Sequence, residues 1–318
     1  MTQIFRLTTS TAILAALAAC GSSTTPTTRN FAETAGTAVK ALDDGKTLTA
    51  QEGGSSAANL NYSNGETSQA TASFALKKNA AGELTFTVNG VEQAFATADR
   101  FVETDGSVYG YDISDPGNDR FVGLFSHTGT LDETLDPANT SNMQIWGYQT
   151  NQITGGPRNV RGFAVVGTET TAAALATLPS ATYSGRARLD SFPTTGFVNN
   201  ETSRTRTRGD VNMAANFGAG TISGQITNIT RQAPGGTQLG VAGSVSMDPT
   251  TINGNGFAGT LTPNATLLTS TGISGASGTY GGTFYGPAGQ QVGGTMTLSG
   301  TEGATGFVST GFFEGNRN

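Results

Sequence analysis

The stretch Gly281-Gly-Thr-Phe-Tyr-Gly-Pro-Ala-Gly-Gln-Gln-Val-Gly-Gly294 joins two strand-like segments through a turn. Gly286 and Pro287 interrupt the first segment, because proline fixes its φ angle and has no backbone N–H to offer a neighbouring strand. Glycine tolerates the positive φ and the close backbone contacts that a tight turn requires. We therefore expect segments 277–285 and 291–298 to pair as an antiparallel hairpin.

Further segments of this kind recur through the C-terminal half at the spacing expected of a sandwich or barrel. Eight strands suffice to close an antiparallel up-and-down barrel whose interior is filled by side chains. Closure also removes the exposed edges of a threonine-rich sheet. The eight strands that we expect are 181–190, 203–217, 220–229, 238–247, 256–261, 277–285, 291–298 and 305–314.

Alternation of apolar and polar residues indicates which side of two of these strands faces the barrel interior. In segment 203–217 the apolar positions are Val211, Met213, Ala215 and Phe217. In segment 238–247 they are Leu239, Val241, Val245 and Met247. Each set is predicted to point inward.

The region before the barrel also reads as strands separated by turns, and Asn89-Gly90 is a strong hairpin signal. Segment 170–178 is the one helix that we expect after the N-terminal leader, and Pro179 ends it. The predicted class is therefore all-β, with a β-rich handle before an eight-stranded barrel. The expected handle strands are 71–77, 83–88, 91–95, 107–113, 120–127, 142–150 and 161–167.

The quoted stretch resembles the signature of the β-barrel lobes of transferrin-binding protein B. The same barrel occurs in factor-H-binding protein and in surface lipoproteins that Slam-type outer-membrane translocons export. The resemblance implies a barrel at 168–318 behind a handle at 45–167, in a protein that binds and does not catalyse. Gln290 and Gln291 stand where the family often has acidic residues, so a function tied to that charge is not implied. The residues that carry the resemblance are Phe284, Tyr285, Gly286, Pro287, Gly293 and Gly294.

The N-terminus reads as a secretory signal, with Arg6 before an apolar run at 11–17. The run ends in Leu17, Ala18, Ala19 and Cys20, which resembles a bacterial lipobox. That resemblance implies cleavage after residue 19, lipidation of Cys20 and anchoring in a membrane. Gly21 is not the aspartate that retains lipoproteins at the inner membrane, which favours the outer membrane. Residues 20–44 are polar and predicted to be a flexible tether.

Charge and residue counts exclude several functions. The chain has 17 Lys and Arg against 23 Asp and Glu, a net charge of -6, so we expect no nucleic-acid partner. His127 is the sole histidine and Cys20 the sole cysteine, which rules out a zinc site built from His and Cys. No G-x-S-x-G elbow is present. We expect neither catalytic residues nor a metal site.

An arginine patch is the first candidate binding surface. Arg204, Arg206 and Arg208 alternate and so share one strand face, the outer face that also holds Asp210. Arg186 and Arg188 lie on the strand expected beside it. These five arginines fit an anionic partner or the carboxylates of a ligand, whereas the plainer interpretation is a solvated barrel exterior.

Haem is a second candidate, as a ligand of the handle. Tyr, His and Met side chains serve as axial haem ligands, and Trp and Tyr are frequent at binding hot spots. The alternative is core packing, which we favour for Trp146 and Tyr148 because they share strand parity. The handle residues concerned are Tyr109, Tyr111, His127, Met143, Trp146 and Tyr148.

Taken together, the sequence predicts an outer-membrane, surface-exposed lipoprotein that binds without catalysis. By resemblance its partner is an iron-carrier protein, haem or another nutrient, and a Slam-type translocon exports it. One alternative is a host-factor-binding or adhesion protein similar to factor-H-binding protein. Another is a structural envelope lipoprotein that faces the periplasm.

Overall fold

The computed structural model describes residues 47–50, 55–61, 64–70, 72–78, 84–93, 95, 97–102, 109–113, 120–125, 142–151 and 158–318. Nearly all of the described elements are strands, and every pairing between them is antiparallel. We call the described residues 47–167 the handle region and the described residues 168–318 the barrel region.

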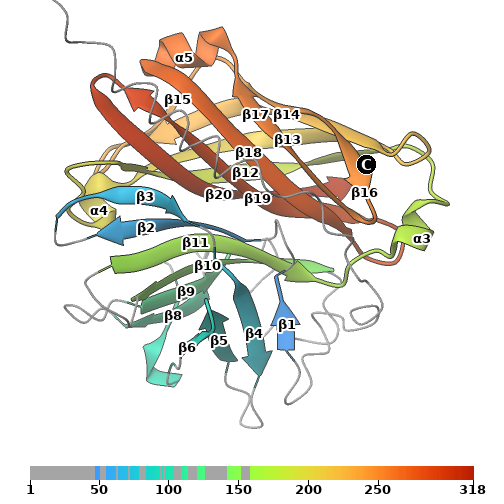
Figure 1. Ribbon diagram of the computed structural model, residues 1–318, viewed down its shortest axis with the longest axis horizontal. Coiled ribbons are helices and arrows are strands. Elements are labelled where there is room, and N and C mark those ends of the chain that lie inside the picture. Colours follow the sequence, from blue (N-terminus) through green and yellow to red (C-terminus); the bar gives the residue numbers. More distant parts are fainter. Residues whose placement is uncertain are drawn as a thin grey trace, which may run out of the picture. The chain divides into compact units, whose positions relative to one another are not determined.

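Eight strands of the barrel region close into an up-and-down barrel, as predicted (Figure 1). Each strand pairs with the next along the chain, and the last strand pairs with the first through residues such as Arg186 and Glu314. Because the ring is complete, its eight strands leave no open edge. The strands are β12 (Ala181–Pro193), β13 (Thr205–Asn216), β14 (Thr221–Gln232), β16 (Val245–Asn253), β17 (Gly256–Pro263), β18 (Ile273–Tyr285), β19 (Gln291–Glu302) and β20 (Thr305–Arg317).

The expected strand 238–247 is in fact two strands. β15 (Gln238–Gly240) pairs only with β14, and β16 begins at Val245. Gly243 between them has a φ of 108°, which breaks the extended chain. Leu239 is consequently 65% exposed, so its predicted inward position is wrong, whereas Val245 and Met247 are buried as predicted.

The alternation on β13 places its side chains as expected. Val211, Met213 and Ala215 are buried in the barrel core, together with Phe217 beyond the strand end. The polar residues between them are exposed. The apolar stripe read from the sequence is therefore the inner wall of the barrel.

Short helices lie at the barrel ends (Figure 1). α3 (Ala172–Leu175) falls within the predicted helix 170–178 and is shorter than predicted. The expectation of a single helix is wrong, because α4 (Asn200–Ser203) and α5 (Ala265–Thr271) are also helical. Asn264 caps α5 by accepting a hydrogen bond from the backbone N–H of Leu267 at 2.9 Å. Among the described residues no helix has the length and apolar character needed to span a membrane.

The handle region forms two sheets. Its larger sheet contains four strands that were expected and three that were not, among them β2 (Ser55–Asn61), whose Ala and Asn residues have low strand propensity. The four-stranded sheet has the order β1 (Thr47–Thr49), β4 (Phe74–Lys78), β5 (Leu84–Val88) and β6 (Val91–Gln93). The seven-stranded sheet has the order β3 (Thr67–Ala70), β2 (Ser55–Asn61), β11 (Arg158–Gly167), β10 (Met143–Asn151), β9 (Arg120–Leu124), β8 (Tyr109–Ile113) and β7 (Arg100–Val102).

Aromatic side chains fill the space between these two sheets. The ring centroids of Phe74 and Tyr148 are 5.4 Å apart, and those of Phe86 and Trp146 are 5.3 Å apart. Tyr111 belongs to the same buried cluster. Paired aromatic rings at these distances stabilise a core beyond the area that they bury.

Candidate functional site

The β18–β19 turn closes the aromatic end of the barrel. Gly286 and Gly289 adopt φ angles of 86° and 62°, which explains why glycine occupies both positions. Directly before the turn, the fully buried ring of Phe284 lies 5.1 Å from that of Phe217 and 5.5 Å from that of Phe257. The quoted sequence stretch therefore anchors one end of the barrel core.

The same stretch also contacts the handle region. A Cβ atom on Gly293 would lie 2.6 Å from the Sδ atom of Met143 on β10. Tyr285 packs in one buried cluster with Met143, Phe163 and Phe312. Glycine at position 293 thus lets a handle strand approach the barrel wall closely.

The two glutamines of the turn make local hydrogen bonds. The Oε1 atom of Gln290 accepts from the backbone N–H of Ala288 at 2.9 Å. Gln291 accepts from the backbone N–H of Asn142 at 2.8 Å and donates to Asn316 at 2.9 Å. Both side chains therefore take part in holding the turn and its neighbours.

Asp190 on β12 is the centre of a buried ion cluster. Its side chain has no exposed surface. Arg188 donates two hydrogen bonds to the Asp190 carboxylate, at 2.9 and 3.0 Å. Arg161 of β11 and Arg204 follow at 3.5 and 3.6 Å. One carboxylate thus joins the barrel region to the handle region.

The charges around Asp190 decide its protonation. Burial alone would raise the pKa of Asp190, but Arg188, Arg204 and Arg161 outweigh this effect and hold that pKa well below its usual range. The carboxylate is therefore ionised at neutral pH. Breaking such a buried pair by removing one partner is strongly destabilising.

The expectation that Arg188 lies on a solvated outer face is wrong. Its guanidinium lies 4.8 Å from the ring centroid of Phe125 and 5.5 Å from that of Phe163, both in the handle region. Arg186 is also engaged, through an ion pair with Glu314 and a hydrogen bond to the carbonyl oxygen of Phe125. The sequence could not show that the handle covers this face of β12.

Arg206 and Arg208 lie on β13, outside the face of β12 that the handle region covers. Arg208 is exposed, and its guanidinium donates to the side chain of Gln238 at 3.2 Å. The Nε atom of Arg206 is buried and has no hydrogen-bond partner within the described part of the chain. Burial and the charge of Arg188 lower the pKa of Arg206 to about 10. Of the predicted patch, this segment of β13 retains accessible positive charge.

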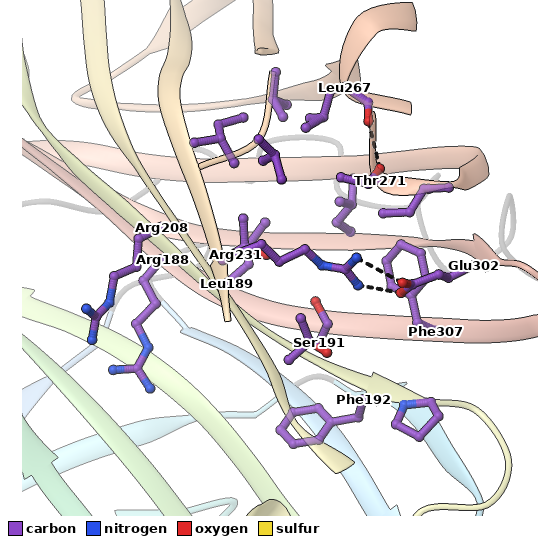
Figure 2. Close-up of a pocket in the computed structure, with 18 of the residues that line it drawn as sticks. Arg188, Leu189, Ser191, Phe192, Arg208, Arg231, Leu267, Thr271, Glu302 and Phe307 are labelled. Carbon is purple, nitrogen blue, oxygen red and sulfur yellow. Dashed lines mark hydrogen bonds and ion pairs between the residues drawn. The ribbon is translucent and has the colours of Figure 1, made fainter. Parts of the chain in front are cut away.

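A cavity of about 470 Å³ occupies the other end of the barrel. Figure 2 shows it as a space between the inner wall and α5, from which Leu267 reaches inward. Arg188 and Arg208 border the cavity through the strand wall, and their side chains point away from it (Figure 2). The pattern of apolar and polar residues along the strands does not predict this cavity. The apolar side chains that line it include Leu189, Ile226, Ile229, Val245, Met296 and Leu298.

One ion pair lies at this cavity. Arg231 of β14 and Glu302 of β19 form a two-pronged interaction in which the Nη1–Oε1 distance is 2.9 Å (Figure 2). Their side chains are 20% and 43% exposed, so the pair lies where the cavity meets solvent. The cavity therefore has a mainly apolar interior and a charged opening.

The handle aromatics proposed for haem are core residues. Trp146 and Tyr148 are buried between the two sheets, as the packing interpretation predicted, and Tyr111 lies with them. Met143 belongs to a different cluster, against the barrel. The hypothesis that these residues together form a haem pocket is therefore wrong for the four whose side chains are described.

Several predicted residues lie outside the part that the structure describes. These include the lipobox residues Leu17, Ala18, Ala19 and Cys20, together with His127; for Tyr109 only the backbone is described. Within the described residues, no cluster of three His, Cys, Asp or Glu side chains is arranged to hold a metal ion.

Comparison with known proteins defines the class of the barrel. Residues 176–312 match the model of the family described as the C-lobe and N-lobe beta barrels of Tf-binding protein B. The barrel region is thus similar to the barrels of transferrin-binding protein B. The resemblance read from 281–294 is thereby confirmed.

Three solved structures to which the chain is similar are transferrin-binding B proteins. A mutant transferrin-binding protein B of Haemophilus parasuis Hp5 is 14% identical, with a TM-score of 0.42, and the match covers 83% of this chain and 45% of that one. The isotype 1 protein of serogroup B Neisseria meningitidis is 14% identical, with a TM-score of 0.39 and coverages of 83% and 43%. A mutant from Actinobacillus pleuropneumoniae H49 is 11% identical, with a TM-score of 0.37 and coverages of 84% and 100%.

This chain spans less than half of the length of the first two of these structures. No curated protein sequence matches it.

Proposed function

We propose that this protein is a lipid-anchored protein of the outer-membrane surface that binds a partner without catalysis. The observation that carries the proposal is the match of residues 176–312 to the barrels of Tf-binding protein B. The lipobox ending at Cys20 supplies the anchor, residues 20–44 the tether, and 45–167 and 168–318 the two folded parts. By analogy with the similar proteins, an iron carrier is the first partner to test, and a Slam-type translocon would export the chain.

The accessible arginines of β13 are the proposed contact for an acidic partner. Arg208 is exposed and Arg206 is partly exposed, so their positive charge lies at the surface, where carboxylates can approach it. Arg204 forms an ion pair with Asp190, so it is not replaced in the test below. Interactions of this kind weaken as salt is added.

Binding is tested by titrating the full chain, carrying Cys20→Ser to prevent lipidation, with iron-loaded and iron-free transferrin and with hemin. The double variant Arg206→Ser with Arg208→Ser should weaken binding at low salt, whereas Lys77→Ser, which removes an exposed handle charge, should not. Binding to neither transferrin nor hemin would refute the iron-related part of the proposal. Equal affinity of the double variant and the parent would remove the arginines from the site.

The other two candidates are separated by location and expression. A host-factor-binding or adhesion protein would be surface-exposed without binding an iron carrier, and its expression would not rise under iron depletion. A periplasm-facing structural lipoprotein would be inaccessible on intact cells.

A further inference from the structure

The barrel interior changes character along its axis. At the end closed by the β18–β19 turn, Tyr183, Phe257 and Phe313 fill the lumen with aromatic rings. At the other end, Ser191, Thr207 and Gly209 line the wall instead. Small side chains at interior positions leave volume unfilled, and the 470 Å³ cavity lies at this end. Cavities of this size fall in the range that binds small molecules, about 300–1,000 Å³.

The interior of the cavity suits an apolar occupant. Leu189, Ile226, Val245 and Met296 belong to the buried barrel core and offer no hydrogen bonds to water. A buried water needs two to four polar partners, and these four side chains supply none, although the hydroxyl groups of Ser191 and Thr207 also line the cavity. An apolar cavity left empty is also costly to the fold.

The opening suits a carboxylate. Arg231 presents its guanidinium to a two-pronged carboxylate, and in this structure that carboxylate belongs to Glu302. Glu302 is 43% exposed and precedes the β19–β20 turn, where Gly303 has a φ of 59°. Solvent-exposed ion pairs contribute little to stability, so Glu302 can turn outward into water at small cost.

We infer that the barrel lumen binds a long-chain carboxylate, with the alkyl chain in the cavity and the carboxylate on Arg231 in place of Glu302. The site is independent of the proposed partner-binding surface on β13, because the side chains of Arg208 and Arg231 lie on opposite sides of the barrel wall (Figure 2).

The binding test uses the full chain with Cys20→Ser in detergent-free buffer, titrated calorimetrically with decanoate, dodecanoate and the methyl ester of dodecanoate. Each buried methylene contributes about 0.8 kcal/mol, which corresponds to about fourfold in Kd, so dodecanoate should bind about fifteenfold more tightly than decanoate. The ester should bind more weakly than the acid. Absence of binding by both acids, or an ester as tight as its acid, would overturn the inference.

Two charge variants give effects of opposite sign. Arg231→Gln should weaken dodecanoate binding about tenfold, because a charged hydrogen-bond partner is lost. Glu302→Gln should tighten it, because the competing carboxylate is gone, and should leave the ester unchanged. Weaker dodecanoate binding in both variants would point to general damage and refute the role of the pair.

A matched pair of tryptophan variants tests the location. Val241 is partly buried against the barrel core and lines the cavity, whereas Leu239, two residues earlier, is 65% exposed. Val241→Trp should abolish dodecanoate binding, and Leu239→Trp should preserve it, with both variants retaining the thermal unfolding transition of the parent. Unchanged binding in a folded Val241→Trp variant would exclude the lumen as the site.

Discussion

Replacement of Asp190 by Asn should destabilise the protein more than any surface substitution. The Asp190 carboxylate is fully buried and lies within 3.6 Å of three guanidinium groups, those of Arg188, Arg161 and Arg204. An asparagine in its place would leave three cations without their shared anion, two of them almost completely buried. Removing one partner of a buried ion pair costs about 3–5 kcal/mol, and we expect a loss in that range.

Urea denaturation, followed by circular dichroism, measures this loss without the charge screening that guanidinium would add. In a parallel thermal melt, at roughly 2–4 °C of Tm for each kcal/mol, the unfolding temperature should fall by about 10 °C. Asp210→Asn is the matched control on the neighbouring strand. Asp210 is exposed, with Asn228 as its hydrogen-bond partner at 2.8 Å, and its replacement should cost less than about 0.5 kcal/mol.

A loss below about 1 kcal/mol for Asp190→Asn would refute the reasoning. It would mean that the arginines are better solvated than their burial indicates, or that the handle region does not depend on this cluster. A similar loss in both variants would equally contradict a specific role for Asp190.

Four other substitutions or conditions have defined outcomes. Ion pairing lowers the folded-state pKa of Asp190, so the stability that Asp190 provides is complete above its unfolded pKa of about 3.9 and is lost as the pH falls below that value. Urea titrations at pH 3 to 6 should show this loss of stability in the parent and not in Asp190→Asn. Burial raises the pKa of Tyr183 to about 12, so its contribution to stability is complete below pH 10 and is lost as the pH rises toward 12. Tyr183→Phe should reduce this loss of stability at alkaline pH, measured by unfolding at a series of pH values. Asn264→Ala removes the cap of α5 and should cost about 1 kcal/mol in urea, with no loss counting against the capping role. Gly294→Ala would place a Cβ atom 2.0 Å from a backbone oxygen and should lower stability by about 1–3 kcal/mol, whereas Gly240→Ala, with open space around it, should be neutral in the same thermal melts.

The barrel could be predicted because its strands obey local rules. The alternation in β13 and the glycine–proline turn after Phe284 each specify a strand face or a strand end without reference to distant residues. Where the same rules were applied across Gly243, the prediction failed, because a single positive φ ended one strand and began another. α5 was not predicted, although the sequence contains its N-cap residue, Asn264, and its C-cap residue, Gly272.

The candidate sites were less predictable because they depend on tertiary contacts. Alternation placed Arg188 on the outer face of the barrel, but only the docked handle shows that this face is covered. The strand β2 was not predicted either. Its Ser56 shares a 2.7 Å hydrogen bond with Thr310 of the barrel, a tertiary contact that the sequence does not reveal. The cavity arises from the absence of large side chains on several strands at one level, which no local pattern records.

Protease treatment of intact cells that express the full chain tests the proposed function most directly. The account predicts that the band detected by an antibody against the barrel disappears from intact cells, and that Cys20→Ser, which cannot be lipidated, is lost from the cell surface. A band that survives until the outer membrane is permeabilised would contradict surface display and would favour the periplasm-facing alternative.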